Sequence, residues 1–169
     1  MPEQSRPPFF PMMIDLQAQK VLIIGGGHIA SRRARTLITC GAEIVAISPE
    51  FCEDFPDEPV KISREFQPED ITEKFTLIIA ATNKREINKL IHDIAKAKNI
   101  PVNIADCQDE CDFFFPSLIN FENVSVSVNS AGKSSKLTHK LSNRLREVWS
   151  DWVLAEREKI ISSIHCEKI

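Results

Sequence analysis

The sequence of 169 residues lacks the features that mark several classes of protein. No apolar run approaches the roughly 18–20 residues that a membrane-spanning helix requires. The N-terminal stretch also has no positively charged start that leads into a long apolar segment. The net charge is −3, so the basic surplus that a general nucleic-acid binder needs is missing. We therefore expect a soluble, cytoplasmic protein with no membrane or nucleic-acid partner.

The cysteines lack a pattern as well. The five of them, at positions 40, 52, 107, 111 and 166, include no CxxC pair. Their odd number and scattered spacing fit neither a disulfide framework nor a zinc site, so reduced thiols and no metal are expected. Cys107 and Cys111 could together hold a metal, but packing of Cys111 as a small hydrophobic residue is the simpler interpretation. His92, His139 and His165 are isolated and are interpreted as surface or helix residues.

What the chain does have is enough apolar material for one core. Hydrophobic residues make up 43% of the sequence and charged residues 27%, which is typical of a globular domain. The length suits one domain with a short appendage. Charge is uneven along the chain: residues 1–131 carry 13 Lys and Arg against 19 Asp and Glu, whereas residues 132–169 carry 8 against 5. The tail is therefore locally cationic.

Short β-branched runs alternate with helical stretches over residues 1–111. The run KVLII at Lys20–Ile24 ends at three glycines and predicts a buried strand. Apolar spacing over His28–Cys40 predicts a helix, which Gly41 ends. Further strands are predicted at 43–47, 75–81 and 101–105, with helical stretches near 68–73 and 84–98. This alternation predicts an α/β fold, a Rossmann-type domain with a doubly wound parallel sheet.

The pattern changes over residues 112–169. Two strands are predicted at 113–120 and 124–130, around a turn at 121–123. A helical stripe follows from Ser134, and its apolar members are Leu137, Leu141, Leu145, Val148, Trp149 and Trp152. A β-plus-helix appendage of this size cannot hold a core alone. We expect it to serve dimerisation and substrate binding in a homodimer.

The glycines after the first strand form a recognisable motif. Gly25, Gly27 and Ala30 give G-x-G-x-x-A between a predicted strand and a predicted helix. In that context the first glycine makes the turn, the second lets a pyrophosphate approach the backbone, and the small third residue allows close packing. The helix N-terminus then faces the anion. The alternative is that the glycines serve only the turn.

The residues after the second predicted strand bear on the choice of cofactor. Ser48-Pro49-Glu50 stands where an acidic residue usually binds the adenine ribose hydroxyls, and Glu50 is a candidate substitute. No arginine lies in Ala46–Glu53 to receive a 2′-phosphate, so NAD is favoured over NADP. Glu50 is equally well interpreted as a solvated loop acid.

Longer stretches resemble a known family. IDLQAQKVLIIGGGHIASRRART resembles the opening of the precorrin-2 dehydrogenase family, which includes the N-terminal module of siroheme synthases. Four further stretches agree in order: ISPE, AATNKREIN, VNIADCQDECDFFFPSLI and SVSVNSAGKSSKLTHKLSNRLRE. The resemblance runs from about Ile14 to Trp149, and the VNxxD…CDFxFP segment is its most specific part.

The resemblance implies NAD-dependent oxidation of precorrin-2 to sirohydrochlorin, on the route to siroheme, by a homodimer. Some members also insert ferrous iron, so a bifunctional enzyme with ferrochelatase activity is one alternative, and a non-catalytic NAD-sensing module is another. The family's essential aspartate falls on Asp106. Its nucleotide contacts fall on Gly25, Gly26, Gly27, His28, Ile29, Ala30, Ser48, Pro49, Glu50 and Thr82. The sequence departs from the family's S-x-G-G-x-S-P loop, since Ala131 and Ser135 replace a glycine and the proline, and its helical tail is shorter than in many members.

The residues themselves also suggest a chemistry. Asp106 follows the fourth predicted strand, at the sheet edge where Rossmann-type folds bind ligands. There a carboxylate can accept a proton, orient a pyrrole N–H, or merely cap a helix. Precorrin-2 carries several carboxylates, so a cationic cleft is expected. The candidate substrate-binding residues are Ser130, Lys133, Lys136, Lys140 and Arg144. The last three share one helical face, which is alternatively a solvated surface.

Overall fold

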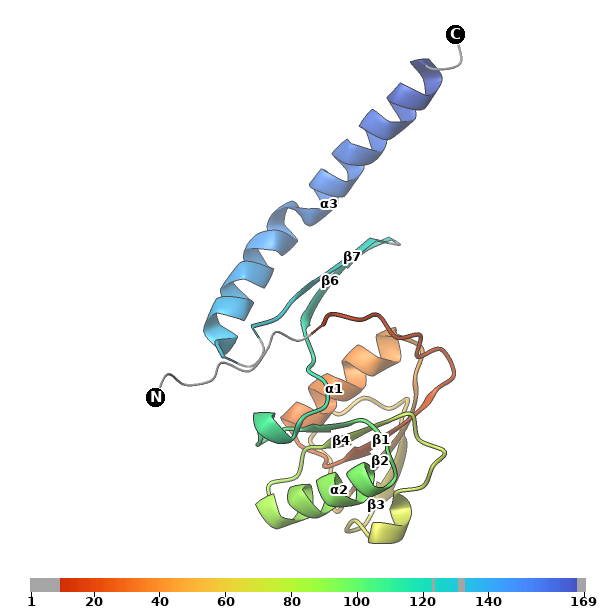
Figure 1. Ribbon diagram of the computed structural model, residues 1–169, viewed down its shortest axis with the longest axis vertical. Helices are drawn as coiled ribbons and strands as arrows, with labels where there is room; N and C mark the ends of the chain where they lie inside the picture. The colour runs from red at the N-terminus through yellow and green to blue at the C-terminus, as the bar shows by residue number, and fades with distance from the viewer. Residues whose placement is uncertain (1–9, 123, 131–132, 167–169) are drawn as a thin grey trace. The chain divides into compact units, whose positions relative to one another are not determined.

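The computed structural model describes residues 10–122, 124–130 and 133–166. The chain divides into two compact units, one from Phe10 to Phe113 and one that starts at Phe114 (Figure 1). Within the described residues, no helix is both long and apolar enough to cross a bilayer.

The first unit contains a parallel sheet with the strand order β3-β2-β1-β4-β5. Its strands are β1 (Lys20–Ile24), β2 (Glu43–Ser48), β3 (Val60–Ser63), β4 (Leu77–Ala80) and β5 (Val102–Ile104). At the carboxyl end of β1, Ile24 lies opposite Ile47 of β2 and Ala80 of β4. The strand order therefore reverses between β1 and β4, where doubly wound folds bind their ligands.

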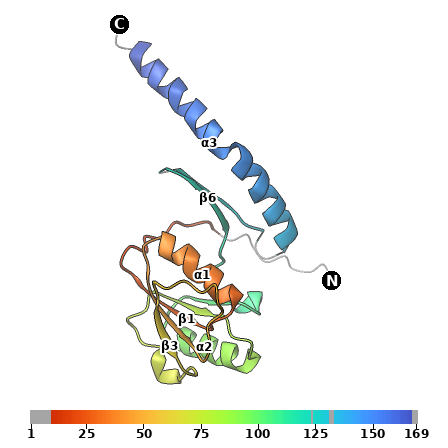
Figure 2. The ribbon, with the colours of Figure 1, turned by 180° about the vertical axis from the view of Figure 1, so that it is seen from behind.

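Two helices cover the opposite faces of this sheet (Figures 1 and 2). The chain passes through α1 (His28–Thr39) from β1 to β2, and through α2 (Arg85–Ala97) from β4 to β5, in the other direction along the sheet. Right-handed crossovers in opposite directions place their helices on opposite faces. The predicted Rossmann-type α/β fold is confirmed.

The core of this unit is the middle of the sheet. All four residues of β4 and Val21–Ile24 of β1 are buried, as the run of apolar residues in each strand predicts for a parallel sheet covered on both faces. Ala30 of α1 and Ile91 of α2 are also fully buried against it. Burying each large aliphatic side chain contributes about 1.5–3 kcal/mol to folding.

The structure differs from the sequence prediction between the second predicted strand and the end of the third. The edge strand β3 was not predicted, because it is short and mostly exposed and so lacks the apolar run that marks the other strands. The helical stretch expected near 68–73 is a single 3-10 turn, Pro68–Asp70. The strand expected at 75–81 is confined to Leu77–Ala80.

The second unit is a two-stranded antiparallel sheet against which a long helix packs. Strand β6 (Ser117–Phe121) pairs with β7 (Val124–Val128), and α3 (Ser135–Cys166) contacts both. Arg146 of α3 donates hydrogen bonds to the Ser117 hydroxyl (3.0 Å) and the Leu118 carbonyl (3.3 Å). Strand β6 begins later than predicted, just after Pro116, which has no N–H to donate to a sheet.

The 3-10 turn after β3 is held by an ion pair whose effect on stability can be measured. Asp70 is largely buried and accepts two hydrogen bonds from the Arg64 guanidinium (2.8 and 2.5 Å) and one from the Gln67 N–H (2.8 Å). These contacts, led by the bond from Arg64, hold the pKa of Asp70 below its ordinary value of 3.8.

We expect Asp70→Asn to lower the free energy of unfolding by about 1–3 kcal/mol at neutral pH, because the ionised acceptor is lost. A carboxyl with a lowered folded pKa stabilises the protein above its unfolded pKa, and that contribution is lost as pH falls through the folded value. The gap between the two proteins in urea unfolding should therefore close below pH 3.8. Asp57→Asn, which breaks an exposed pair with Lys61, is the control and should change little. A gap that persists in acid would contradict the assignment.

Candidate functional site

A cavity of about 760 Å³ opens at the carboxyl ends of β1, β2 and β4. Its walls come from the glycine turn after β1 and from the loops that follow β2, β3 and β4. The volume suits a small molecule or cofactor, and the position is the switch point of the sheet. Of the residues predicted from the sequence, it brings together Gly25, Gly26, Gly27, Ile29, Ser48, Pro49, Glu50 and Thr82.

Two glycines of the turn have no room for a side chain. Gly25 has a φ of +124°, and a Cβ there would lie 2.3 Å from the carbonyl oxygen of Ala81. A Cβ on Gly26 would lie 2.0 Å from the carbonyl oxygen of Glu50. The turn is therefore packed between the loop after β4 and the loop after β2. Ala30, the small residue of the motif, is fully buried and lines no part of the cavity.

Gly27 is a glycine for a different reason. Nothing lies within 4 Å of a Cβ built on it, and its φ of −82° suits any residue. It is the N-cap of α1, and the first turn of that helix carries no acidic side chain. Open space beside free helix N–H groups is what a pyrophosphate needs. The residues present therefore fit a dinucleotide.

The loop after β2 is fixed to the glycine turn. The Cys52 N–H donates to the Gly26 carbonyl (2.8 Å), and the Ser48 hydroxyl donates to the Glu50 carbonyl (2.7 Å). Glu50 itself lines the cavity, and among the described residues that line it there is no arginine. The loop thus presents a carboxylate where the adenine ribose is expected.

The loop after β4 is held by a residue that the sequence prediction missed. Asn88 is fully buried in α2 and accepts from the Thr82 N–H (3.1 Å) and hydroxyl (2.7 Å). It also donates to the Thr82 carbonyl (3.1 Å). The signal was present, because Asn88 occupies the buried face of α2 with Ile91 and Ala95, at helical spacing. A polar residue on such a face usually has a hydrogen-bonding role.

Two charged residues meet at the cavity. Lys84 Nζ lies 3.1 Å from Glu65 Oε1, and both side chains line the cavity wall. This ion pair links the loop after β3 to the loop after β4. The sequence prediction missed it because Glu65 follows a strand that had no clear pattern.

Asp106 lies beyond the end of β5, and it does not line the cavity. Its side chain is 36% exposed, and its Oδ1 accepts from the Arg85 guanidinium at 3.1 Å. Arg85 also pairs with Glu110 of the short 3-10 turn Gln108–Glu110. The hydrogen bond to Glu110 and the charge of that carboxylate, with a smaller contribution from Asp106, raise the pKa of Arg85, so the guanidinium stays charged. The exposed carboxylate is accessible to a substrate.

Hydrogen bonds to β5 hold the loop that carries Asp106 in place. The Cys111 thiol is buried, accepts from the Ile104 N–H (3.2 Å) and lies 3.2 Å from the Ile104 carbonyl. Asn103 donates to the Phe113 carbonyl (2.8 Å). Burial raises the pKa of Cys111, so its thiol remains protonated and serves packing. The backbone around Asp106 is thereby held against β5.

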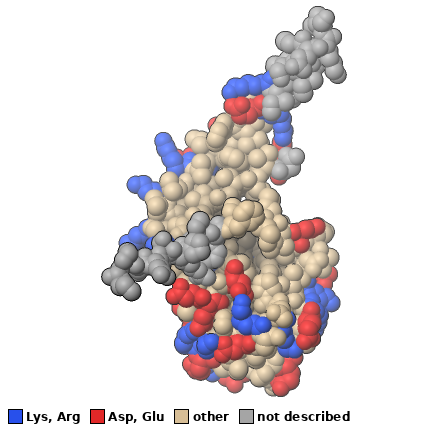
Figure 3. All heavy atoms as spheres, in the orientation of Figure 1, with Lys and Arg blue, Asp and Glu red and all other residues tan. Residues whose placement is uncertain are grey.

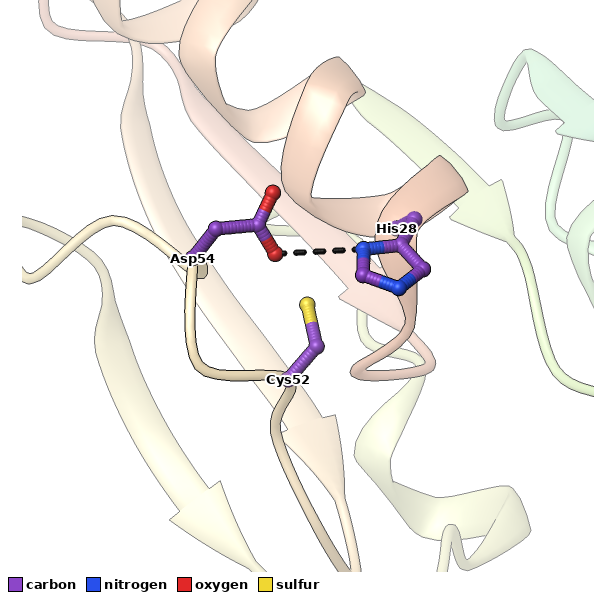
Figure 4. A group of neighbouring side chains, drawn as sticks. All are labelled: His28, Cys52 and Asp54. Carbon is purple, nitrogen blue, oxygen red and sulfur yellow. Dashed lines mark hydrogen bonds and ion pairs between the residues drawn. The ribbon is translucent and has the colours of Figure 1, made fainter.

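The remaining predicted residues lie elsewhere. His28 is exposed, its ring faces Asp54 (Figure 4), and it is not among the residues that line the cavity. Lys133, Lys136, Lys140 and Arg144 belong to the second unit and are exposed there. Ser130 accepts from the Ser134 N–H (3.1 Å) and so closes the turn before α3, whereas Ala131 lies outside the described residues.

A comparison with protein families identifies the part of the chain that forms the cavity. A family model described as "Putative NAD(P)-binding" matches residues 12–117, the stretch that contains every residue lining the cavity. The chain belongs to this NAD(P)-binding family. Membership of this family supports a dinucleotide cofactor, and NAD is the form that the residues favour.

The individual proteins that this chain resembles are named for siroheme biosynthesis or for precorrin-2 dehydrogenation. The chain is 37% identical over 145 residues to a "Probable multifunctional siroheme biosynthesis protein HemA" of Ruminiclostridium josui, covering 82% of this chain and 28% of that protein. It is 35% identical over 142 residues to a siroheme synthase of Photorhabdus laumondii, covering 81% and 30%. The chain thus spans about three tenths of the length of these relatives. The solved structure "SirC, precorrin-2 dehydrogenase" shares the fold, with a TM-score of 0.70 and 23% identity over 86% of this chain and 76% of that one.

We expect Gly27→Val to abolish NAD binding while leaving the fold intact, because a Cβ at this position has open space around it and the larger side chain would occupy the space beside α1. Calorimetric titration with NAD measures the first effect and thermal unfolding the second. Gly26→Ala is the contrasting variant, since its Cβ would meet the Glu50 carbonyl and should lower Tm. Unchanged NAD affinity in Gly27→Val would refute this position for the pyrophosphate.

Proposed function

We propose that this chain catalyses the NAD-dependent dehydrogenation of precorrin-2 to sirohydrochlorin in siroheme biosynthesis. The observation that carries the proposal is the pairing of a cofactor cavity at the switch point with an accessible carboxylate, Asp106, beyond the adjacent strand. The relatives support the substrate, because their names are siroheme synthase, siroheme biosynthesis protein and precorrin-2 dehydrogenase. A cytoplasmic location goes with it, since the described cysteines are free thiols, as in reducing compartments.

NAD rather than NADP fits the walls of the cavity. Glu50 stands at the end of β2, where a carboxylate accepts hydrogen bonds from the ribose hydroxyls. The same negative charge repels a 2′-phosphate, and the described lining offers no arginine to offset it. Lys84 is already paired with Glu65.

Asp106 is proposed as the group that takes the proton. Dehydrogenation removes a hydride from carbon and a proton from nitrogen or carbon, and bound NAD supplies the hydride acceptor. The Asp106 carboxylate accepts the proton, or it orients the macrocycle by accepting from a pyrrole N–H. Arg85 acts as a positioning residue, because its guanidinium holds Oδ1 of Asp106 while the side chain of Asp106 remains 36% exposed.

The second unit is proposed to bind the carboxylates of the tetrapyrrole. Lys136 and Lys140 lie one turn apart on an exposed face of α3, and Arg144 follows at the same spacing. Lys133 precedes the helix and Ser130 closes the turn before it. A cationic face of this kind raises the local concentration of a multiply negative substrate.

We expect Asp106→Asn to bind NAD normally but to lose roughly 10²–10⁴ in kcat, because the amide cannot accept a proton. Spectrophotometric turnover of precorrin-2 with NAD measures this effect. Asp93→Asn, on the exposed face of α2, is the matched control and should keep wild-type turnover.

Three roles for Asp106 give different results. If it orients the ring, the loss falls mainly on KM. If it serves only to pair with Arg85, Asp106→Ala loses at most about 1 kcal/mol of stability and keeps its kcat. Near-wild-type kcat in both variants would end the catalytic assignment.

The second unit is also proposed to form a homodimer. The apolar residues Leu137, Leu141, Val148 and Trp152 of α3 are about half-exposed. Figure 3 shows a broad uncharged surface over this unit, with Lys and Arg side chains at its margins. An apolar face of this size on a helix that packs against only two strands favours burial against a second copy.

We expect light scattering at micromolar concentration to give the mass of two chains. Changing Leu141 and Trp152 together to Glu should yield a folded monomer, because two charges would be buried in the interface. Leu90→Glu, at an exposed leucine of α2, is the control and should remain dimeric. A wild-type protein with the mass of one chain would refute the dimer.

A further inference from the structure

Three side chains of different chemistry converge beside the cofactor cavity (Figure 4). They are His28, the first residue of α1, and Cys52 and Asp54 of the loop after β2. One ligand atom from each, a ring nitrogen, a sulfur and a carboxylate oxygen, lies within 4.8 Å of the other two. Among the described residues, this is the one group of three such side chains.

We propose that His28, Cys52 and Asp54 bind a divalent transition-metal ion of the zinc class. Mixed nitrogen, sulfur and oxygen donors suit Zn²⁺ or Co²⁺, whereas Mg²⁺ and Ca²⁺ prefer oxygen alone. A tetrahedral ion with Zn–N and Zn–O bonds of about 2.0 Å separates those two ligand atoms by about 3.3 Å. His28 Nδ1 and Asp54 Oδ1 already lie 3.2 Å apart.

The backbone holds two of the ligands in place independently of any ion. The Cys52 N–H donates to the Gly26 carbonyl (2.8 Å), which ties that residue to the glycine turn. The Asp54 carbonyl accepts from the Ser31 hydroxyl (2.9 Å) and from the Arg35 guanidinium, both on α1. Because hydrogen bonds join the loop to the helix that carries His28, the three side chains stay close to one another. Preorganisation of this kind lowers the cost of binding.

The site is also open to an ion. The side chains of His28 and Asp54 are 85% and 57% exposed, so a metal and a water as fourth ligand can reach them. A thiolate and a carboxylate together neutralise a divalent cation. The Cys52 thiol gives up its proton to solvent when the ion binds, as a cysteine ligand of a metal does.

The proposal reverses the expectation from the sequence, which predicted no metal. The ligands stand at positions 28, 52 and 54, on two segments that the β1–β2 pairing and the hydrogen bonds of the loop to the glycine turn and α1 bring together. No compact spacing marks such a site. Cys52 also lines the cofactor cavity, so the ion would join the two segments that form its walls.

The test uses the full chain without an affinity tag, dialysed free of metal and titrated with Co²⁺ alone, in the absence of NAD. We expect a thiolate-to-cobalt charge-transfer band at one ion per chain, and one-to-one Zn²⁺ binding by calorimetry. Cys52→Ser should abolish the band. His28→Gln and Asp54→Asn should each weaken Zn²⁺ binding by at least about tenfold, in line with loss of a ligand.

Matched controls separate this site from other thiols and imidazoles. Cys40→Ser changes an exposed cysteine at the end of α1, and His92→Gln changes a histidine that pairs only with Asp93 and Lys89 among the described residues. Both should keep the band and the affinity. Asp106→Asn should also keep them, so the outcome does not depend on the proposed dehydrogenase activity.

Absence of the band in the wild-type protein would overturn the proposal. So would an unchanged band in Cys52→Ser, or its loss in Cys40→Ser. Far-ultraviolet circular dichroism checks that each variant is folded. If Cys52→Ser fails to fold, undiminished Zn²⁺ affinity in both His28→Gln and Asp54→Asn would overturn the proposal by itself.

Discussion

The close packing of the glycine turn between two loops is the constraint on which the cofactor site depends. Gly25 touches the loop after β4 through Ala81, and Gly26 touches the loop after β2 through Glu50. These contacts bring three loops from one sheet edge within reach of a single ligand. The space that is left open lies at Gly27, beside the N-terminus of α1. The same packing that excludes side chains at two positions therefore defines the opening at the third.

The central fold could be predicted from the sequence because its signals are local. The buried strands read as apolar runs, and the glycines mark the turn between β1 and α1. Strand β3 could not be predicted in this way, since it is an edge strand of four residues, three of them exposed, and has no such run. Its position is decided by pairing with β2, which is a contact between distant parts of the chain.

The residues of the candidate site also divide into those that local sequence signals predict and those that only contacts between distant segments define. Gly25–Gly27, Glu50 and Thr82, which line the cavity, were predicted as site residues because they belong to short motifs or to a family resemblance. Asn88, the Lys84–Glu65 pair and the Arg85–Asp106 pair were missed, because each is defined by a partner that the fold supplies. An ion pair between separate loops leaves no periodic trace in a sequence. Such contacts decide how rigidly a site is held, while motifs decide where it lies.

The edge strand β3 has a consequence for the behaviour of the protein at high concentration. An exposed sheet edge presents unpaired N–H and carbonyl groups that can recruit a strand from another molecule and start aggregation. Here that edge is only four residues long and carries Lys61, whose ammonium group is paired with Asp57 at 2.8 Å. Adding a strand would bury this charge and disturb the pair. The edge of the sheet thus resists aggregation through its short length and its charge.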